Sequence, residues 1–248
     1  MVIKQNVSTL LHSLLKDVAV PVFSGPLRGW KWLPPSGNHA YWLGKHEKAY
    51  VNAFAEHIQP GDVVFDIGAQ AGYFTLIASR LAGKEGHVVA FEPFPKNSEF
   101  IKEHCRLNHC DNVTLQEVAV GGSPGQRSFQ SANLFMGHLS DVAPDERASD
   151  ENALVVEVVT LDSLIADNSA PVPSILKIDT EGMEYWVLQG GKSFIDKHRP
   201  ILFIATHGAV NQKRTLELLK SWRYEIKMIG KGSAKNADYL AKPIVSSL

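Results

Sequence analysis

The sequence predicts an α/β fold in which helices cover both faces of a mostly parallel, open sheet. Short, continuously apolar segments alternate along the chain with segments of helical periodicity, as in doubly wound sheets. A glycine-rich turn follows the first of these apolar segments, where such folds bind ligands. The 248 residues, 44% of them hydrophobic, suit one α/β domain with a large core.

The composition excludes several classes of protein. The chain has 25 Lys and Arg against 26 Asp and Glu, so it lacks the basic excess that is typical of nucleic-acid-binding domains. No segment approaches the ~18 apolar residues of a membrane span. Two cysteines, Cys105 and Cys110, are too few for a disulfide framework. We therefore expect a reduced, cytoplasmic protein without nucleic-acid partners.

Residues 1–60 are expected to form an N-terminal helical cap. Apolar residues from Val7 to Val18 recur at helical spacing, which predicts an amphipathic helix that ends before Pro21. That helix packs either on its own domain or on a second copy of the chain, so a homo-oligomer stays open. Residues 21–44 are rich in Pro, Gly and Trp and predict an irregular wrap, followed by a helix over 45–58.

Residues 61–248 form the predicted main domain. Its core strands are expected at 63–65, 87–91, 113–120, 175–178 and 201–206, with helices at 73–81 and 97–107. Two more strands, 224–229 and 238–241, predict an antiparallel edge.

Residues 121–153 are rich in Gly, Ser, Pro and Asp and predict an insertion in this domain. A hairpin between 127–130 and 155–159 is expected at its base. His138 lies in this loop, where it either enters the site from a lid or is a solvated surface residue.

The turn after the first core strand carries the main signal for a ligand. It reads Asp66-Ile67-Gly68-Ala69-Gln70-Ala71-Gly72, and Glu92 follows the second strand. Glycines let the backbone approach a ligand, and an acid after the second strand accepts hydrogen bonds from ribose hydroxyls. The Asp66 carboxylate would repel a dinucleotide pyrophosphate, and Gln70 replaces the second glycine of the dinucleotide pattern. S-adenosylmethionine, with its cationic amino-acid end, fits better than a nicotinamide cofactor.

Several ordered motifs span residues 41–208. They are Gly44-Lys45-His46-Glu47, Val63-Val64-Phe65-Asp66-Ile67-Gly68-Ala69, Gly72-Tyr73-Phe74-Thr75, Ala90-Phe91-Glu92-Pro93, Val159-Thr160-Leu161-Asp162-Ser163-Leu164 and Leu176-Lys177-Ile178-Asp179-Thr180-Glu181-Gly182-Met183-Glu184. Together they resemble the FkbM-type methyltransferases, a branch of the Rossmann-like S-adenosylmethionine-dependent enzymes. The last motif is the most diagnostic.

The resemblance implies a seven-stranded Rossmann-like sheet with S-adenosylmethionine at its carboxyl edge. At matching positions, the loop around the methionine end of the cofactor would be Asp66, Gly68, Ala69 and Gly72, with Asp179 at its amino group. The ribose and adenine would meet Glu92, Pro93, Phe94, Glu117 and Val118. One departure concerns the strand after Pro200, where family members often carry a Glu and this chain has apolar residues and then His207.

Asp179, Glu181 and His207 are the catalytic candidates. They follow adjacent predicted strands, so they should converge at the sheet edge beside the methyl group. They could act as a general base with its orienting acid, or as ligands for a divalent metal. Alternatively, they only organise the turn, the cofactor and a helix end.

The implied activity is O-methylation of a hydroxyl group on a small molecule, a sugar or a glycosylated or polyketide-like metabolite. A nicotinamide-dependent oxidoreductase and a non-catalytic binding protein are the alternatives, because the fold alone does not fix the function. Trp30, Trp32, Tyr41 and Trp42 could stack on sugar rings or pack in the core.

Two further acids have structural interpretations. Asp162 precedes a short apolar helix and is expected to cap it. Glu47 either starts its helix or closes the pocket from the N-terminal side.

Overall fold

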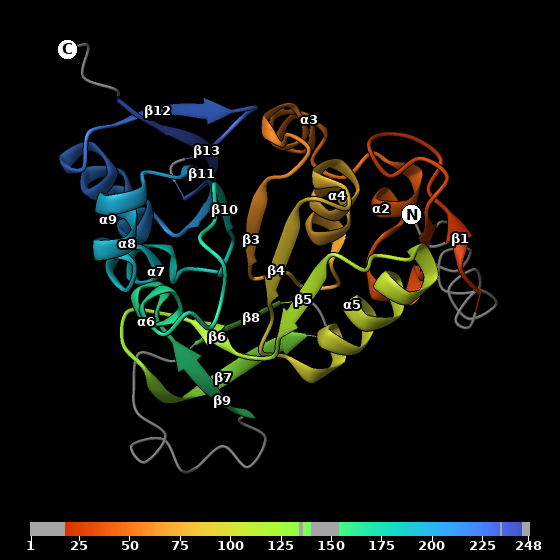
Figure 1. Cartoon of the computed structure of the whole chain (residues 1–248), viewed down its shortest axis with the longest axis horizontal. Coiled ribbons are helices and arrows are strands. Elements are labelled where there is room, and N and C mark those ends of the chain that lie inside the picture. The colour runs from red at the N-terminus through yellow and green to blue at the C-terminus, as the bar shows by residue number, and fades with distance from the viewer. Residues whose placement is uncertain (1–17, 134–135, 140–153, 234, 245–248) are drawn as a thin grey trace.

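The computed structural model describes residues 18–133, 136–139, 154–233 and 235–244. Its centre is a seven-stranded sheet with the order β12-β13-β11-β10-β3-β4-β5 (Figure 1). The strands are β3 (Val63–Ile67), β4 (His87–Phe91), β5 (Val113–Gln116), β10 (Ile175–Ile178), β11 (Ile201–His207), β12 (Tyr224–Ile229) and β13 (Asn236–Pro243). β13 is antiparallel to both neighbours, and the other pairings are parallel. The predicted α/β class, mostly parallel sheet and antiparallel edge are confirmed.

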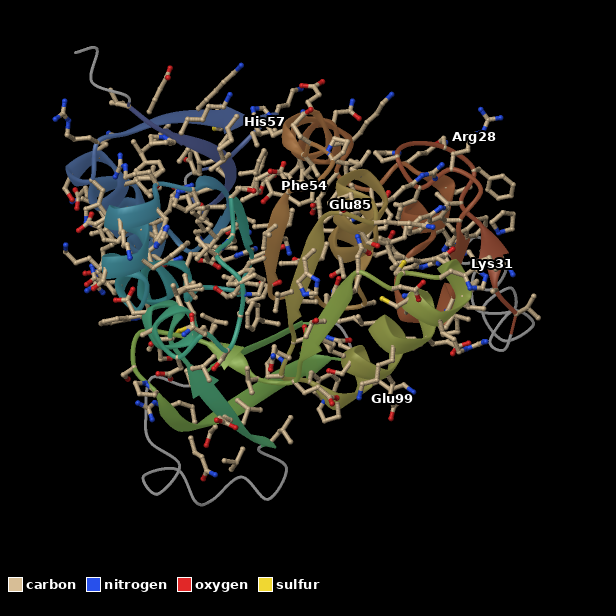
Figure 2. The ribbon with its side chains drawn as sticks, in the orientation of Figure 1. Arg28, Lys31, Phe54, His57, Glu85 and Glu99 are labelled. Carbon is tan, nitrogen blue, oxygen red and sulfur yellow. The ribbon has the colours of Figure 1, made fainter. Side chains whose placement is uncertain are left out.

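Helices cover both faces of this sheet (Figure 1). One face carries α3 (Lys48–His57), α4 (Tyr73–Ala82) and α5 (Pro95–Asn108), and the other carries α6 (Leu161–Ala166), α7 (Glu184–Gln189), α8 (Lys192–His198) and α9 (Ala209–Ser221). Successive strand residues point to opposite faces, so Val64 and Phe65 join separate hydrophobic clusters. Phe54 points from α3 toward the interior (Figure 2), where its ring lies 5.2 Å from that of Phe203. No helix in the described part of the chain has the length and apolar character to cross a membrane.

A second sheet lies below the first in Figure 1, with the order β6-β9-β7-β8. Its strands are β6 (Ala119–Val120), β7 (Gly125–Asn133), β8 (Met136–Leu139) and β9 (Leu154–Val159). β7 pairs antiparallel with β9, as predicted, but β8 lies between them in the chain and also pairs with β7, so β7 and β9 do not form a hairpin. His138 lies on β8 and not in a loop. Residues 134–135 and 140–153 of the predicted insertion lie outside the described residues.

The predicted single strand over 113–120 is wrong in extent. β5 pairs with β4 only as far as Gln116, and β6 pairs with β9 of the second sheet from Ala119 onward. The chain changes sheets between them. The sequence hides this change, because partly buried or buried apolar residues occur on both sides of it: Val113 and Leu115 before, and Val118, Ala119 and Val120 after.

The segment before α3 packs against α5. It contains β1 (Val20–Pro21), β2 (Lys31–Trp32), a short 3₁₀ turn η1 (Pro34–Ser36) and α2 (His39–Leu43), and Figure 2 shows Arg28 and Lys31 on its outer side. His104 of α5 fixes the segment, because Nε2 accepts from the Leu33 amide (3.0 Å) and the ring stacks on Trp32 (4.0 Å). Its Nδ1 donates to the Ala71 carbonyl at 2.8 Å. Burial lowers the pKa of His104 to about 4, which keeps the ring neutral.

Residues 7–17 of the predicted amphipathic helix lie outside the described part of the chain.

Asp162 does not cap its own helix. α6 begins with a capping box of Thr160 and Ser163. The Asp162 carboxylate instead accepts hydrogen bonds from the amides of Phe194 (2.8 Å) and Ser193 (3.1 Å) at the start of α8. Asp162 therefore caps a helix, as expected, but the helix is α8 and not α6.

Candidate active site

A cavity of about 290 Å³ opens at the carboxyl edge of the seven-stranded sheet. The chain segments that follow β3, β4, β10 and β11 form most of its wall, because parallel strands all end at this edge. Tyr41, His46 and Glu47 complete the wall from the N-terminal segment, and Asp238 of β13 completes it from the sheet edge. The cavity therefore has two sides, one around Glu92 and one around His207.

The Glu92 side contains a buried carboxylate held in a fixed orientation. Glu92 Oε2 accepts from the amide of Gln70 at 2.8 Å, and Oε1 accepts from the amide of Phe94 at 2.9 Å. Gln70 adopts a left-handed conformation with φ 51°, which is part of the turn that presents its amide to Glu92. Burial raises the pKa of Glu92 to about 7 although these amides oppose the change. Glu92, Pro93, Phe94, Gly68 and Ala69 all line the cavity.

Asp66 lies behind the wall and not in it. Its fully buried carboxylate accepts from the Thr75 hydroxyl at 2.6 Å and lies 3.1 Å from Nζ of Lys177. Lys177 does line the cavity, and its Nζ also donates to the Gly68 carbonyl at 3.0 Å. Burial opposes the charge of Lys177, but Asp66 and Asp179 raise its pKa, so it is a cation. Asp66, expected in the loop around the cofactor, thus lies next to Lys177 and does not line the cavity.

Two positions of this turn, Gly68 and Gly72, require glycine for structural reasons. Gly68 has φ +77°, and a Cβ there would lie 2.0 Å from the Asp179 carbonyl oxygen. Gly72 precedes α4 with φ +90° and faces Ile101, outside the cavity wall. Gly68 therefore requires glycine for close backbone packing, and Gly72 requires it for its positive φ.

On the His207 side, the three catalytic candidates converge. Nε2 of His207 lies 3.9 Å from Oδ1 of Asp179 and 3.7 Å from Oε2 of Glu181. Nδ1 of the same ring donates to Oε1 of the buried Glu184 at 3.3 Å. Donor atoms of Asp179, Glu181 and His207 all lie within 4.8 Å of one another, so a base and a metal-ligand arrangement are both geometrically open.

Glu184 holds this arrangement together. Its carboxylate accepts from the amides of Thr180 and Gly182, each at 3.0 Å, and from the side-chain amide of Asn211. Burial opposes the charge, but the hydrogen bonds from His207 and these amides lower the pKa of Glu184. Burial also lowers the pKa of His207, yet the bond to Glu184 and the charges of Asp179 and Glu181 outweigh it and raise that pKa to about 9. His207 is therefore protonated at neutral pH.

The N-terminal wall carries aromatic and acidic groups. The hydroxyl of Tyr41 donates to Oε1 of Gln70 at 3.0 Å, and the Tyr41 ring lies 4.0 Å from that of His46. Glu47 precedes α3 without a side-chain capping bond and lines the cavity, so of its two proposed roles it closes the pocket. Partial burial, Asp179 and Asp238 raise the pKa of Glu47 to about 7.

Among the four aromatic residues weighed for sugar stacking, Tyr41 alone lines the cavity. Trp32 is fully buried in the core, Trp30 lies beneath the guanidinium of Arg80, and Trp42 packs on Phe23.

Glu117 and Val118 do not line the cavity. Oε2 of Glu117 lies 2.8 Å from Nζ of Lys102 on an exposed surface, and the wall is formed by Ala119 and Val120 of β6 instead. This shift follows from the break between β5 and β6. The pattern of the sequence also missed Lys177, Glu184 and Asp238, although a lysine inside the apolar strand Ile175–Ile178 is itself a signal of a buried charge.

The sequence profile described as the "Methyltransferase FkbM domain" matches residues 66–229. The chain belongs to the FkbM methyltransferase family. It is therefore an S-adenosylmethionine-dependent methyltransferase, as the turn after β3 and the acid after β4 indicated.

Named relatives of this FkbM methyltransferase are distant. The hexuronic acid methyltransferase AglP of Haloferax volcanii is 24% identical over 173 residues, covering 70% of this chain and 67% of AglP. The 31-O-demethyl-FK506 methyltransferase FkbM of Streptomyces tacrolimicus is 29% identical over 159 residues, covering 54% of this chain and 60% of that enzyme. An arsenite methyltransferase of Halobacterium salinarum is 25% identical, and the match spans 44% of its length. The chain thus spans less than two thirds of two of these three relatives.

Solved structures agree on the fold. A methyltransferase FkbM from Methylobacillus flagellatus superposes with a TM-score of 0.51 at 16% identity, covering 83% of this chain and 55% of that one. A precorrin-6y C5,15-methyltransferase from Geobacter metallireducens gives a TM-score of 0.50 at 16% identity, covering 81% and 90%. The seven-stranded fold of class I methyltransferases is confirmed.

Proposed function

We propose that this FkbM methyltransferase transfers the methyl group of S-adenosylmethionine to a hydroxyl oxygen of a small molecule, a sugar or a glycosylated or polyketide-like metabolite. The observation that carries the proposal is the Glu184–His207 pair, whose Nε2 faces the cavity beside Asp179 and Glu181. An alcohol is a weak acid, so its methylation benefits from a positioned base. The name of the FkbM relative, a 31-O-demethyl-FK506 methyltransferase, is consistent with an oxygen acceptor, and that of AglP with a sugar-derived acceptor.

The cavity fits the cofactor at both ends. The Glu92 carboxylate offers fixed acceptor oxygens to a ribose diol. Lys177 and Asp179, whose side chains lie 3.6 Å apart, offer opposite charges to the zwitterionic methionine end. Phe91, Phe94 and Val120 line the wall with apolar surface suited to an adenine ring.

Two residues of the chain, His207 and Glu184, have separate roles in the proposed transfer. When bound, S-adenosylmethionine supplies a methyl group whose bond to sulfur breaks as the new bond to oxygen forms. His207 in its neutral form accepts the hydroxyl proton at Nε2. Glu184 is a positioning residue, because it fixes the ring through Nδ1 and stabilises the imidazolium that results.

A metal-assisted variant has one observation in its favour, the 4.8 Å grouping of Asp179, Glu181 and His207. In that variant the three side chains bind a divalent cation that acidifies the hydroxyl. Turnover that a chelator abolishes and Mg²⁺ or Mn²⁺ restores would assign them as ligands. Turnover unaffected by chelator supports the base.

The proposal is tested by product identification. The protein is incubated with methyl-labelled S-adenosylmethionine and a metabolite extract, and products are examined for a mass gain of one methyl group. A label on a hydroxyl oxygen supports the proposal, and a label on a carboxylate, nitrogen or carbon overturns it. Calorimetric titration with S-adenosylhomocysteine and NAD provides the control, since tight NAD binding without a response to S-adenosylhomocysteine would contradict the cofactor assignment.

A further inference from the structure

The His207 side of the cavity is rich in carboxylates from separate parts of the chain. Glu47 precedes α3, Asp179 and Glu181 follow β10, and Asp238 lies on β13. Within the described residues, the cations that line the cavity are Lys177 and protonated His207, because burial and Lys177 lower the pKa of His46 to about 4.

Each of the two cations already has a carboxylate behind the wall. Lys177 lies 3.1 Å from Asp66, and His207 lies 3.3 Å from Glu184. The side chains of both acids are 0% exposed. The two cations are thus balanced from the interior, and the wall adds four further carboxyl groups on this side, of which Asp179 also lies 3.6 Å from Lys177 and Glu181 3.7 Å from His207.

These wall carboxylates also act on one another. Burial raises the pKa of Asp238, and the charge of Asp179 raises it further. The charges of Asp179 and Asp238 also raise the pKa of Glu47. A bound cofactor with one net positive charge would offset only part of this excess. The wall on the His207 side therefore keeps a net negative charge, which is weakly screened inside a cavity.

We propose that the acceptor carries an ammonium group beside its hydroxyl group, as in an amino sugar or another amino alcohol. This inference rests on the proposed function, because it names the class of acceptor for the same site. An ammonium group donates three hydrogen bonds, which carboxylate oxygens of the wall can accept. An acidic acceptor meets like charge at the same place.

The test compares three sugars of similar shape and different charge: D-glucosamine, D-glucose and D-glucuronate. Each is titrated by saturation-transfer NMR into the whole chain loaded with S-adenosylhomocysteine, in the presence of chelator. We expect glucosamine to saturate at a concentration at least about tenfold lower than glucose, and glucuronate to bind most weakly. Added salt should weaken glucosamine more than glucose.

Asp238→Asn should reduce the preference for glucosamine over glucose several-fold and leave the affinity for S-adenosylhomocysteine unchanged. Glu85→Gln is the matched control, because Glu85 is exposed and does not line the cavity (Figure 2). Equal effects of the two variants would overturn the inference.

Glucuronate binding as well as or better than glucosamine, with or without added Mg²⁺, would also overturn it. Loss of S-adenosylhomocysteine binding in the wild type would instead contradict the proposed function, so the two failures are distinguishable.

Discussion

Nδ1 of His207 donates a hydrogen bond to Oε1 of Glu184 across 3.3 Å, and the Glu184 side chain is closed to solvent. A carboxylate only accepts hydrogen bonds, so this contact places the proton on Nδ1 and turns Nε2 toward the cavity. Backbone amides of Thr180 and Gly182 fix the same carboxylate. The loop after β10 therefore sets the orientation of a side chain on β11.

The rate should rise with pH. The pKa of His207 is about 9, and the base must be neutral to accept a proton, so kcat/KM falls as pH drops below that value. The groups that face His207 are Glu184 of α7, Asn211 of α9, Asp179 and Glu181 after β10, Asp238 of β13 and Glu47. Glu181→Gln removes one raising charge and should move the midpoint of the profile to lower pH. A flat profile between about pH 6 and 9 would contradict the base assignment.

His207→Ala should lower kcat by ~10²- to 10⁴-fold, the usual contribution of a general base. Affinity for S-adenosylhomocysteine should stay nearly unchanged, because β10 and β3 separate the strand that carries His207 from the strand that precedes Glu92. Asp179→Ala should reduce both quantities, since Asp179 also lies 3.6 Å from Lys177. Steady-state kinetics and calorimetry separate the effects. Full turnover by His207→Ala with the true acceptor means that the histidine is structural.

Cofactor affinity should depend on the charge of Glu92. Its pKa is about 7, so the carboxylate takes up a proton as pH falls through this value and loses acceptor capacity for ribose hydroxyls. We expect S-adenosylhomocysteine to bind more weakly at pH 6 than at pH 8. Glu92→Gln should weaken binding by about 10- to 100-fold and flatten this dependence. Glu99→Gln, on the exposed surface of α5 (Figure 2), is the control and should match the wild type in calorimetry.

Gly68→Ala should destabilise the fold strongly. Its Cβ would lie 2.0 Å from the carbonyl oxygen of Asp179, at a φ of +77° that side chains avoid. Gly29 has a similar φ of +85° with nothing within 4 Å of the added Cβ, so Gly29→Ala isolates the conformational cost of about 1–2 kcal/mol. Urea denaturation should show a clearly larger loss for Gly68→Ala. Equal losses of stability in the two variants would show that the loop after β10 moves to accommodate the added methyl group.

His104→Phe should also destabilise the protein, by about 2–4 kcal/mol. The phenyl ring keeps the stacking on Trp32 but leaves the buried amide of Leu33 and the carbonyl of Ala71 without this partner. Denaturation at pH 7 measures the loss, and His198→Phe, in the last turn of α8, is the control. A stability equal to that of the control would mean that the segment before α3 is held by its apolar contacts alone.

Much of the fold follows from the sequence because its strands are short and apolar. β4 and β10 have the predicted bounds, since buried parallel strands appear in a sequence as mainly apolar runs. The antiparallel edge strand β12 also has its predicted bounds. The change of sheets between Gln116 and Ala119 was missed, because an apolar run does not tell which neighbour a strand pairs with.

Site residues could be predicted from the sequence where they directly follow, or end, a predicted strand. Glu92, Asp179, Glu181 and His207 were found in this way. The remaining groups depend on packing between distant segments: Glu184 belongs to a helix that turns back on His207, and Tyr41 reaches the cavity only because α5 holds the N-terminal segment. Local patterns carry no information about such contacts.

The bond between His104 and Leu33 joins residues 71 positions apart and bears on how the chain folds as it is synthesised. The ribosome releases Trp32 and Tyr41 before α5 exists, so the segment that contains them has no helix to pack against at that stage. They can take their places only after the helix that contains His104 has emerged and packed. This part of the cavity wall is therefore synthesised before α5 but can form only after α5 has folded.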